Sequence, residues 1–317
     1  MKLKNGWLHK KTYIKAITWS GLVLALGIGF CCYEIFGREA KALMVIMYAI
    51  LFFLIASVVF TSFYSKEMRE FGDKVNEVYM SMDPQSFYDY ISELDFSVLH
   101  EETKTKIAFF MAWFMHFEGK NEEAREMFYA KAVKPFPYPN MLSLKSLIEI
   151  YLLDDMNKGY TVVKDTLNEL NETKLNAKMK QQLENEIKGQ VIRLDAITSG
   201  EASDDIIESL KGSVAQFEYV QNQCFLAYLL KDKDPHAAYE AKKYVLENYG
   251  KFTEYKNIAE KIEIDFDPVK WQEEHPVEEV EDTPDTEVVT NTEEVIENNE
   301  TEVKENTNVE ETNSEEK

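Results

Sequence analysis

The sequence predicts an all-α protein with three parts: a two-helix transmembrane hairpin, a helical soluble domain and a disordered acidic tail. Two long uncharged apolar runs lie near the N-terminus, and apolar residues recur every three or four positions through the middle of the chain. The sustained alternation of β-branched residues that is typical of strands is missing from the sequence. We expect a basic N-terminus at residues 1–15, the hairpin at 16–64, the helical domain at 65–267 and the tail at 268–317.

Both apolar runs are long enough to cross a bilayer. Ala16–Tyr33 has 18 residues and Ala42–Tyr64 has 23, and neither contains a charge. At 1.5 Å per residue they extend roughly 27 and 34 Å, against a hydrocarbon core of about 30 Å. A cleaved signal peptide is the alternative for the first run, but its apolar core is long for that role and ends at Cys31–Cys32 instead of a small-residue cleavage site. We predict membrane helices over about residues 14–36 and 42–64.

The basic residues predict that both chain ends lie on the cytoplasmic side of the cell membrane. Five lysines precede the first apolar run and Lys66, Arg69 and Lys74 follow the second, whereas the connecting turn holds only Arg38 and Lys41. Segments rich in lysine and arginine stay in the cytoplasm during insertion. The interior of the hairpin contains two cysteine thiols but no Asp, Glu, Lys, Arg or His, so we interpret it as an anchor and not as a transport path.

The middle of the chain has the apolar spacing of helices. Phe71, Val75 and Val78 recur at helical intervals, and Asp83–Pro84 then marks a break and a new helix start. The most apolar stretch, Ile107–Phe117, extends only about 16 Å, too short to cross a bilayer. Because it is apolar on all sides, we expect a helix packed between neighbouring helices.

One segment resembles a tetratricopeptide repeat. Ala112, Gly119, Ala124 and Phe128 have the mutual spacing of that repeat, in the context AWFMHFEGKNEEAREMFYAKAV. The segment departs from the family pattern at Lys131, where a third small residue is usual. Further breaks, spaced about 35–41 residues apart, suggest more stacked helix pairs; they lie at Gly119, Gly159, Gly200 and Asp234–Pro235.

The resemblance implies an α-solenoid that binds a protein or peptide through the first helix of each pair. In the best repeat, the positions that would line such a groove are Lys106, Phe109, Trp113, His116 and Phe117. Interior packing is the alternative interpretation for the three aromatic residues among them. The resemblance leaves the oligomeric state and the identity of the partner open.

Composition and motifs argue against several classes of protein. The net charge is −22, but residues 273–317 carry −16 of it, from 18 acidic residues against Lys304 and Lys317. The remaining chain is nearly balanced and lacks the basic surplus that nucleic-acid binding requires. His100–Glu101–Glu102–Thr103–Lys104 lacks the second histidine of a zinc protease motif. We predict no metal, no cofactor and no catalytic residue.

The expected function is that of a membrane-anchored adaptor whose cytoplasmic helical domain binds a protein or peptide. The alternative is a non-catalytic accessory subunit of a membrane complex for secretion or envelope assembly, in which the hairpin contacts other membrane helices. A third possibility is an enzyme whose catalytic residues come from distant parts of the chain. The acidic tail is too polar and too charged to fold by itself.

Overall fold

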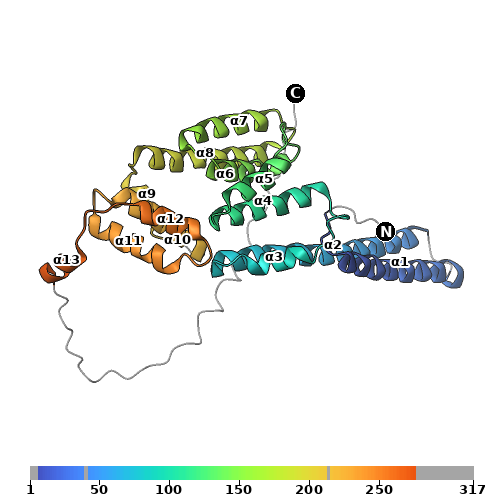
Figure 1. Ribbon diagram of the computed structural model, residues 1–317. Coiled ribbons are helices and arrows are strands. Elements are labelled where there is room, and N and C mark those ends of the chain that lie inside the picture. Colours follow the sequence, from blue (N-terminus) through green and yellow to red (C-terminus); the bar gives the residue numbers. More distant parts are fainter. Residues whose placement is uncertain (1–5, 39–41, 213–214, 276–317) are drawn as a thin grey trace, which may run out of the picture. The chain divides into compact units, whose positions relative to one another are not determined.

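The computed structural model describes residues 6–38, 42–212 and 215–275, and these residues form helices and connecting segments without any strand (Figure 1). The prediction of an all-α chain is confirmed for this part. The chain divides into two units, Met1–Asp267 and Pro268–Lys317. The helices of the first unit are α1 (Lys10–Arg38), α2 (Ala42–Ser81), α3 (Gln85–Ser92), α4 (Glu101–Phe117), α5 (Asn121–Lys131), α6 (Leu142–Tyr151), α7 (Gly159–Asn171), α8 (Ala177–Ser199), α9 (Asp204–Leu210), α10 (Gln216–Leu230), α11 (Pro235–Asn248) and α12 (Thr253–Lys261), with 3₁₀ turns η1 (Pro139–Met141) and η2 (Met156–Lys158).

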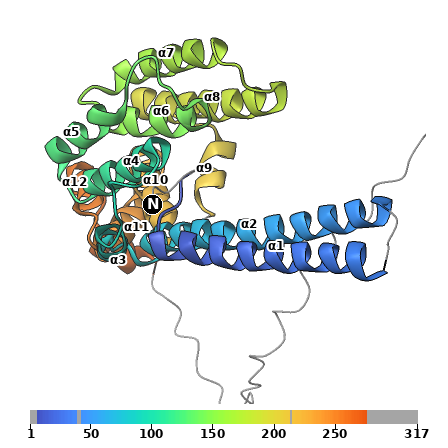
Figure 2. The same ribbon diagram turned by 90° about the vertical axis from the view of Figure 1, so that its right-hand side faces the viewer.

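Helices α1 and α2 lie side by side and form a hairpin (Figure 2). Both are long enough and apolar enough to cross a membrane. Their large apolar side chains point outward: Leu26 is 63% exposed and Phe53 is 62% exposed. The inward-facing position Gly27 lies against Phe52, where an added Cβ would come within 2.5 Å of the ring. The helices therefore pack closely on one side and present an apolar surface on the other.

Helix α2 continues without a break from the apolar run into the soluble domain. It contains 40 residues and ends at Ser81, a length of about 60 Å. Beyond Tyr64 the same helix buries Phe71, Val75 and Val78. The boundary predicted between residues 64 and 65 therefore falls inside one helix, because no residue there interrupts the helical hydrogen bonds.

The predicted helix breaks coincide with helix boundaries. Asp83 Oδ1 accepts a hydrogen bond of 3.0 Å from the Gln85 backbone N–H at the start of α3. Gly119 connects α4 to α5 with a φ of +81°, and Gly200 ends α8 with a φ of +69°. Asp234 caps α11, where its carboxylate accepts from the Ala237 N–H at 3.0 Å. The turns at Gly119 and Asp234 each join two helices that pack on each other, α4 with α5 and α10 with α11. Helices α6 and α7 form another such pair.

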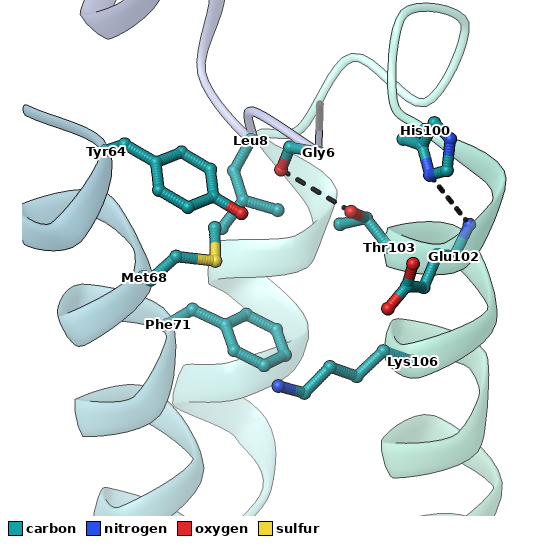
Figure 3. Close-up of a pocket in the computed structure, with 9 residues that line it drawn as sticks. All are labelled: Gly6, Leu8, Tyr64, Met68, Phe71, His100, Glu102, Thr103 and Lys106. Carbon is teal, nitrogen blue, oxygen red and sulfur yellow. Dashed lines mark hydrogen bonds between the residues drawn. The ribbon is translucent and has the colours of Figure 1, made fainter. Parts of the chain in front are cut away.

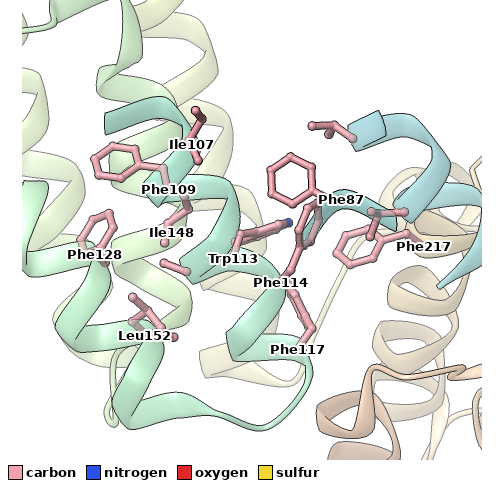
Figure 4. Close-up of a cluster of buried hydrophobic side chains, with 14 of the residues drawn as sticks. Phe87, Ile107, Phe109, Trp113, Phe114, Phe117, Phe128, Ile148, Leu152 and Phe217 are labelled. Atoms are coloured by element: carbon pink, nitrogen blue, oxygen red, sulfur yellow. The ribbon is translucent and has the colours of Figure 1, made fainter. Parts of the chain in front are cut away.

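Helix α4 lies inside the helical domain, as the apolar stretch Ile107–Phe117 predicts (Figure 4). On one side Phe109 meets Phe128 of α5 at 4.9 Å between ring centroids. On another side Phe114 meets Phe87 of α3 at 5.2 Å. At its C-terminal end Phe117 stacks on a ring of α12, with centroids 4.8 Å apart. The surrounding helices leave α4 little free surface.

The last helices of the domain return to the first ones. Phe217 of α10 packs on Tyr79 of α2 with ring centroids 4.9 Å apart, and the Lys251 N–H donates a 2.9 Å hydrogen bond to the Met82 carbonyl. Gly250 has a φ of +57°, and a Cβ there would lie 2.5 Å from the Met82 Cβ. In a pure solenoid each repeat contacts only its neighbours. This domain instead closes on itself through contacts of α10 with α2 and of α12 with α4.

Residues 6–8, directly before α1, are buried, and His9 is half-buried. Trp7 and Leu8 are 2% and 1% exposed. The carboxylate of Glu67, on α2, accepts hydrogen bonds from the backbone N–H groups of Leu8 at 2.8 Å and His9 at 2.7 Å. Trp7 also packs on Tyr64 with ring centroids 5.2 Å apart. We call the contacts of residues 7–9 with α2 the N-terminal clamp.

The predicted disordered tail begins with ordered structure. Pro268–Glu274 forms helix α13, in which Trp271 stacks on His275 at 4.6 Å and Lys270 Nζ lies 3.9 Å from Glu274 Oε1. The first residues of the predicted tail are therefore helical in the structure. Proline at the first helical position and these local contacts favour the helix. The rest of the predicted tail, residues 276–317, lies outside the described residues.

We expect Gly27→Ala to destabilise the hairpin, because the new Cβ would overlap the Phe52 Cβ and Cγ atoms. These atoms lie close to the backbone and move only if the helices separate. The expected cost is about 1–3 kcal/mol, measured as a lower unfolding temperature of the full-length protein in detergent micelles. Gly29→Ala is the control, since nothing lies within 4 Å of its Cβ position. Equal unfolding temperatures for the two variants would contradict the packing described here.

We expect Glu67→Ala to release the N-terminal clamp. The substitution leaves the N–H groups of Leu8 and His9 without their acceptor, at a cost of about 1–3 kcal/mol for each donor that stays buried. Hydrogen exchange at these two amides should accelerate, while exchange in α4 changes little. Glu70→Ala, at an exposed position of the same helix, is the control. Unchanged protection of both amides in the Glu67 variant would show that the clamp is held by other contacts.

Candidate functional site

The structure does not bring the five predicted groove residues to one surface. Phe109 is fully buried and stacks on Phe136 with ring centroids 5.7 Å apart. Trp113 is 5% exposed and packs on Tyr151 at 4.9 Å. Both are core residues, so their assignment to an open groove is corrected. The physical reason is that α4 has neighbours on several sides, whereas a groove-lining helix leaves one face open.

The four residues of the repeat signature lie where α4 and α5 meet. Ala112, Ala124 and Phe128 are fully buried. Gly119 forms the turn, and its left-handed φ of +81° favours a residue without Cβ. Thr253, the first residue of α12, donates from its hydroxyl to the neighbouring Glu118 carbonyl at 2.8 Å. The signature therefore builds one closely packed helix pair whose turn also receives α12.

His116 and Phe117 line a cavity of about 570 Å³ that we call the central cavity. Its wall comes from α4, α5, α6, α8, α10 and α12, together with the connecting segments beside them. The lining residues are His116, Phe117, Asn121, Arg125, Tyr151, Leu153, Asp154, Met156, Ile197, Gln221, Cys224, Phe225, Tyr228, Glu254, Tyr255, Ile258, Lys261 and Ile262.

The polar groups of the central cavity are held by specific hydrogen bonds. His116 Nδ1 lies 2.6 Å from Asn121 Oδ1; because an amide oxygen only accepts, the Nδ1 atom carries the ring proton. Burial lowers the pKa of His116 below its usual value, so the ring is neutral near pH 7. Gln221 Nε2 donates to the Tyr151 hydroxyl at 2.6 Å. The first bond joins α4 to α5, and the second joins α10 to α6.

A guanidinium lies at the edge of the central cavity. Arg125 Nε donates to the Leu152 carbonyl at 2.9 Å, and its Nη2 donates to Asp154. The guanidinium is thereby held between α5 and the end of α6. Glu254 and Lys261 of α12 line the same cavity. Two cationic and two anionic side chains thus surround a largely apolar interior, and their formal charges balance.

The cysteine of the central cavity has the environment of a packing residue. Burial raises the pKa of the Cys224 thiol to about 12, which keeps it protonated. A nucleophilic cysteine needs the opposite shift. Among the described residues, no group of three or more His, Cys, Asp or Glu side chains is arranged to hold a metal ion.

Lys106, the remaining predicted groove residue, lines a different cavity, of about 390 Å³ (Figure 3). We call it the membrane-proximal cavity, since it begins beside Tyr64 at the end of the second apolar run. Its lining residues are Gly6, Leu8, Tyr64, Met68, Phe71, His100, Glu102, Thr103 and Lys106. His100, which begins the incomplete zinc motif, caps α4 here: its Nδ1 accepts from the Glu102 N–H at 3.3 Å.

Most residues of the two cavities could not be found by reading local motifs. Tyr151, Gln221 and Tyr255 are far apart in the sequence and converge only through the packing of α6, α10 and α12. Leu8 reaches the membrane-proximal cavity through the clamp on Glu67. The sequence does contain one signal for the contact of the N-terminal segment with α2. Trp7 and Leu8 are large apolar residues, a type that is usually buried, in the basic segment before the first apolar run.

No protein-family model matches this chain, and comparisons with curated proteins and with solved structures give no significant match. The functional argument therefore starts from the two cavities and the apolar hairpin. Of the two cavities, the central one is larger and is lined by the greater number of helices.

The buried His116 should make stability depend on pH. Its pKa is lower in the folded than in the unfolded protein, so the unfolded chain binds the extra proton more readily. The stabilising contribution is present above the unfolded pKa of about 6.5 and is lost as the pH falls below it. Unfolding of the full-length protein in micelles, compared at about pH 7.5 and about pH 5.5, should show a smaller loss for His116→Gln than for wild type. An identical loss would show that His116 does not contribute.

Proposed function

We propose that this protein is a membrane-anchored adaptor whose helical domain binds a protein or peptide partner in the central cavity. The observation that carries the proposal is the central cavity itself, which is mostly apolar and has a few fixed polar groups at its wall and edge. Binding sites for side chains of a partner have this composition. The cavity is joined, through the packed helices of one unit, to a hairpin suited to a bilayer.

The anchoring part of the proposal rests on the exposed apolar surface of α1 and α2. Soluble proteins rarely expose apolar patches of this extent. Lys10, Lys11 and Lys15 lie at the start of α1, and Lys66 and Arg69 follow the apolar part of α2. By the positive-inside rule both flanks face the cytoplasm, which would also place the helical domain there.

The resemblance to tetratricopeptide repeats supports the binding part of the proposal. The pairs α4 with α5, α6 with α7 and α10 with α11 are the kind of unit from which such domains are built. In the open form of that architecture a partner lies along a continuous groove. Here α10 returns to α2 and α12 returns to α4, and a cavity open to solvent on one side takes the place of the continuous groove. We therefore propose that the partner inserts a short segment rather than lying along the whole domain.

The lining of the central cavity indicates the chemistry of that segment. Phe117, Ile197 and Ile258 offer apolar contacts, and Tyr228 adds an aromatic ring with a hydroxyl. Because the charges at its edge balance, neither a strongly acidic nor a strongly basic peptide is favoured. An aromatic or aliphatic side chain with polar neighbours fits best, since the apolar group fills the cavity and the polar groups meet its edge.

The accessory-subunit alternative is supported by a different observation. Helix α2 passes from the hairpin into the domain core without a hinge, and the N-terminal clamp fixes the hairpin to the same helix. A hairpin that contacts other membrane helices would therefore hold the domain in a fixed orientation. In that case partners would be recognised in the membrane and the domain would only brace them.

The adaptor proposal is tested by Ile258→Lys, which introduces a charge into the central cavity. Ile258 is 39% exposed, so the lysine can be accommodated without unfolding. The full-length protein is crosslinked in native membranes, and recovered proteins are quantified by mass spectrometry. We expect recovery of the specific partner to fall by roughly tenfold, equivalent to about 1.4 kcal/mol of binding free energy.

A control variant and a chain with an exchanged hairpin distinguish the adaptor from the accessory subunit. Ile192→Lys is the matched control, because Ile192 lies on the surface of α8, is 51% exposed and is not part of the central cavity. A chain with an unrelated two-helix hairpin tests the alternative. If the protein is an adaptor, Ile258→Lys loses the partner, whereas Ile192→Lys and the chain with the exchanged hairpin keep it. A partner that survives this substitution but is lost with the exchanged hairpin would refute the adaptor and support the accessory subunit.

A further inference from the structure

The membrane-proximal cavity begins where α2 leaves the apolar run. Tyr64 is the last residue of that run, and Phe71, two helical turns later, forms the far end of the wall contributed by α2 (Figure 3). The step of seven residues from Tyr64 to Phe71 rises about 10 Å. The polar layer of a bilayer adds about 5–8 Å on each side of its hydrocarbon core. A hairpin that spans the membrane therefore places this cavity at the level of the lipid headgroups.

Two opposite charges line the membrane-proximal cavity without pairing. Glu102 and Lys106 lie four residues apart on α4, in the order that favours an ion pair along a helix. The Lys106 ammonium instead lies over the Phe71 ring, 5.7 Å from its centroid. Glu102 accepts a hydrogen bond of 3.0 Å from Asn140 Nδ2. Within the described residues neither side chain has an ion-pair partner.

Another lysine on this turn of α4 does form an ion pair. Lys104 Nζ lies 2.6 Å from Glu101 on the same turn. Glu102 and Lys106 point toward the cavity and not toward each other (Figure 3). A cation and an anion held apart in one cavity form a site for a ligand that carries both charges, because each charge then gains a partner of opposite sign.

We propose that the membrane-proximal cavity binds the headgroup of a zwitterionic phospholipid that carries a primary ammonium. Lys106 binds the phosphate, and Glu102 accepts from the ammonium. Leu8 and Met68 form the apolar part of the wall and contact the lipid next to its headgroup. The proposal goes beyond partner binding in the central cavity, although it rests on the insertion of the hairpin into a bilayer.

A lipid is favoured over a soluble zwitterion because of where the cavity lies. The segment Gly6–Leu8 forms part of the wall and is held by the N-terminal clamp, so the site requires the same residues that fix the hairpin. Lipid at this level is tethered in the bilayer and present at high local concentration. A soluble zwitterion has neither advantage, and it cannot use the apolar contacts of Leu8 and Met68.

The experiment uses the full-length protein, purified in detergent, with bound lipid quantified by native mass spectrometry. The probes are phosphatidylethanolamine, which carries both charges, phosphatidylglycerol, which carries only the phosphate, and free phosphoethanolamine, which lacks the acyl chains. We expect phosphatidylethanolamine to bind at least roughly tenfold more tightly than either of the others. Retention in membranes after an alkaline wash is measured separately, so a failure of insertion is distinguished from the absence of this site.

Two substitutions separate the roles of the charges. Lys106→Gln should weaken binding of both phospholipids by roughly tenfold, because the phosphate loses a charged hydrogen bond. Glu102→Gln keeps an acceptor for Asn140 and should reduce only the preference for phosphatidylethanolamine. Lys104→Gln is the control, with the same change of charge on the same helix but outside the cavity.

Three results would overturn the proposal. Unchanged lipid retention in both cavity variants would show that bound lipid only surrounds the hairpin. An equal loss in Lys104→Gln would show general electrostatic attraction to the membrane surface. Equal affinity for free phosphoethanolamine would refute the assignment to a lipid.

Discussion

Helix α2 is one uninterrupted helix whose two halves lie in different environments. Its first half presents apolar side chains outward, whereas its second half buries Phe71, Val75 and Val78 in the core of the soluble domain. Helix α1, the N-terminal clamp and the returning helix α10 all pack on this one helix. A break in α2 between its two halves would separate every one of these contacts from the others.

The transition between the two halves is stabilised by polar groups that a bilayer core would not tolerate. Glu67, one turn past the apolar run, is almost completely buried but has two backbone N–H donors and the His9 ring as partners. Burying a carboxylate is costly unless such partners compensate for lost water. The adjoining rings of Trp7 and Tyr64 are of the type that prefers the membrane interface. The same short region thus ends the apolar surface and begins the folded domain.

Helix α4 connects the two cavities. Lys106 belongs to the membrane-proximal cavity, and His116 and Phe117 belong to the central cavity. His116 lies ten residues after Lys106 on the helix, a rise of about 15 Å. Because Phe109 and Phe114 are packed tightly between these points, α4 holds both sites at a fixed separation.

The sequence contained enough information for the hairpin, the all-α domain and most helix breaks, since these depend on local charge and on residues such as Gly119, Gly200 and Asp234. It did not reveal the closure of the domain, because the contact of Phe217 with Tyr79 joins residues far apart in the chain. The groove prediction failed at Phe109 for the same reason: periodicity shows that a helix is apolar, not which neighbours cover it. The continuity of α2 could be predicted from the sequence, since no helix-breaking proline lies between Tyr64 and Pro84.

The hydrogen bond from Lys251 to Met82 also determines how late during synthesis the end of α2 can be covered. Residues of the hairpin leave the ribosome long before Lys251, so α2 enters its final environment while its C-terminal end still lacks the helices that cover it. The side chains of Tyr79 and Met82 therefore lack their covering partners until α10 and the segment after α11 are synthesised. Nascent chains truncated before residue 250 should therefore be the ones that recruit chaperones, and the completed chain should release them.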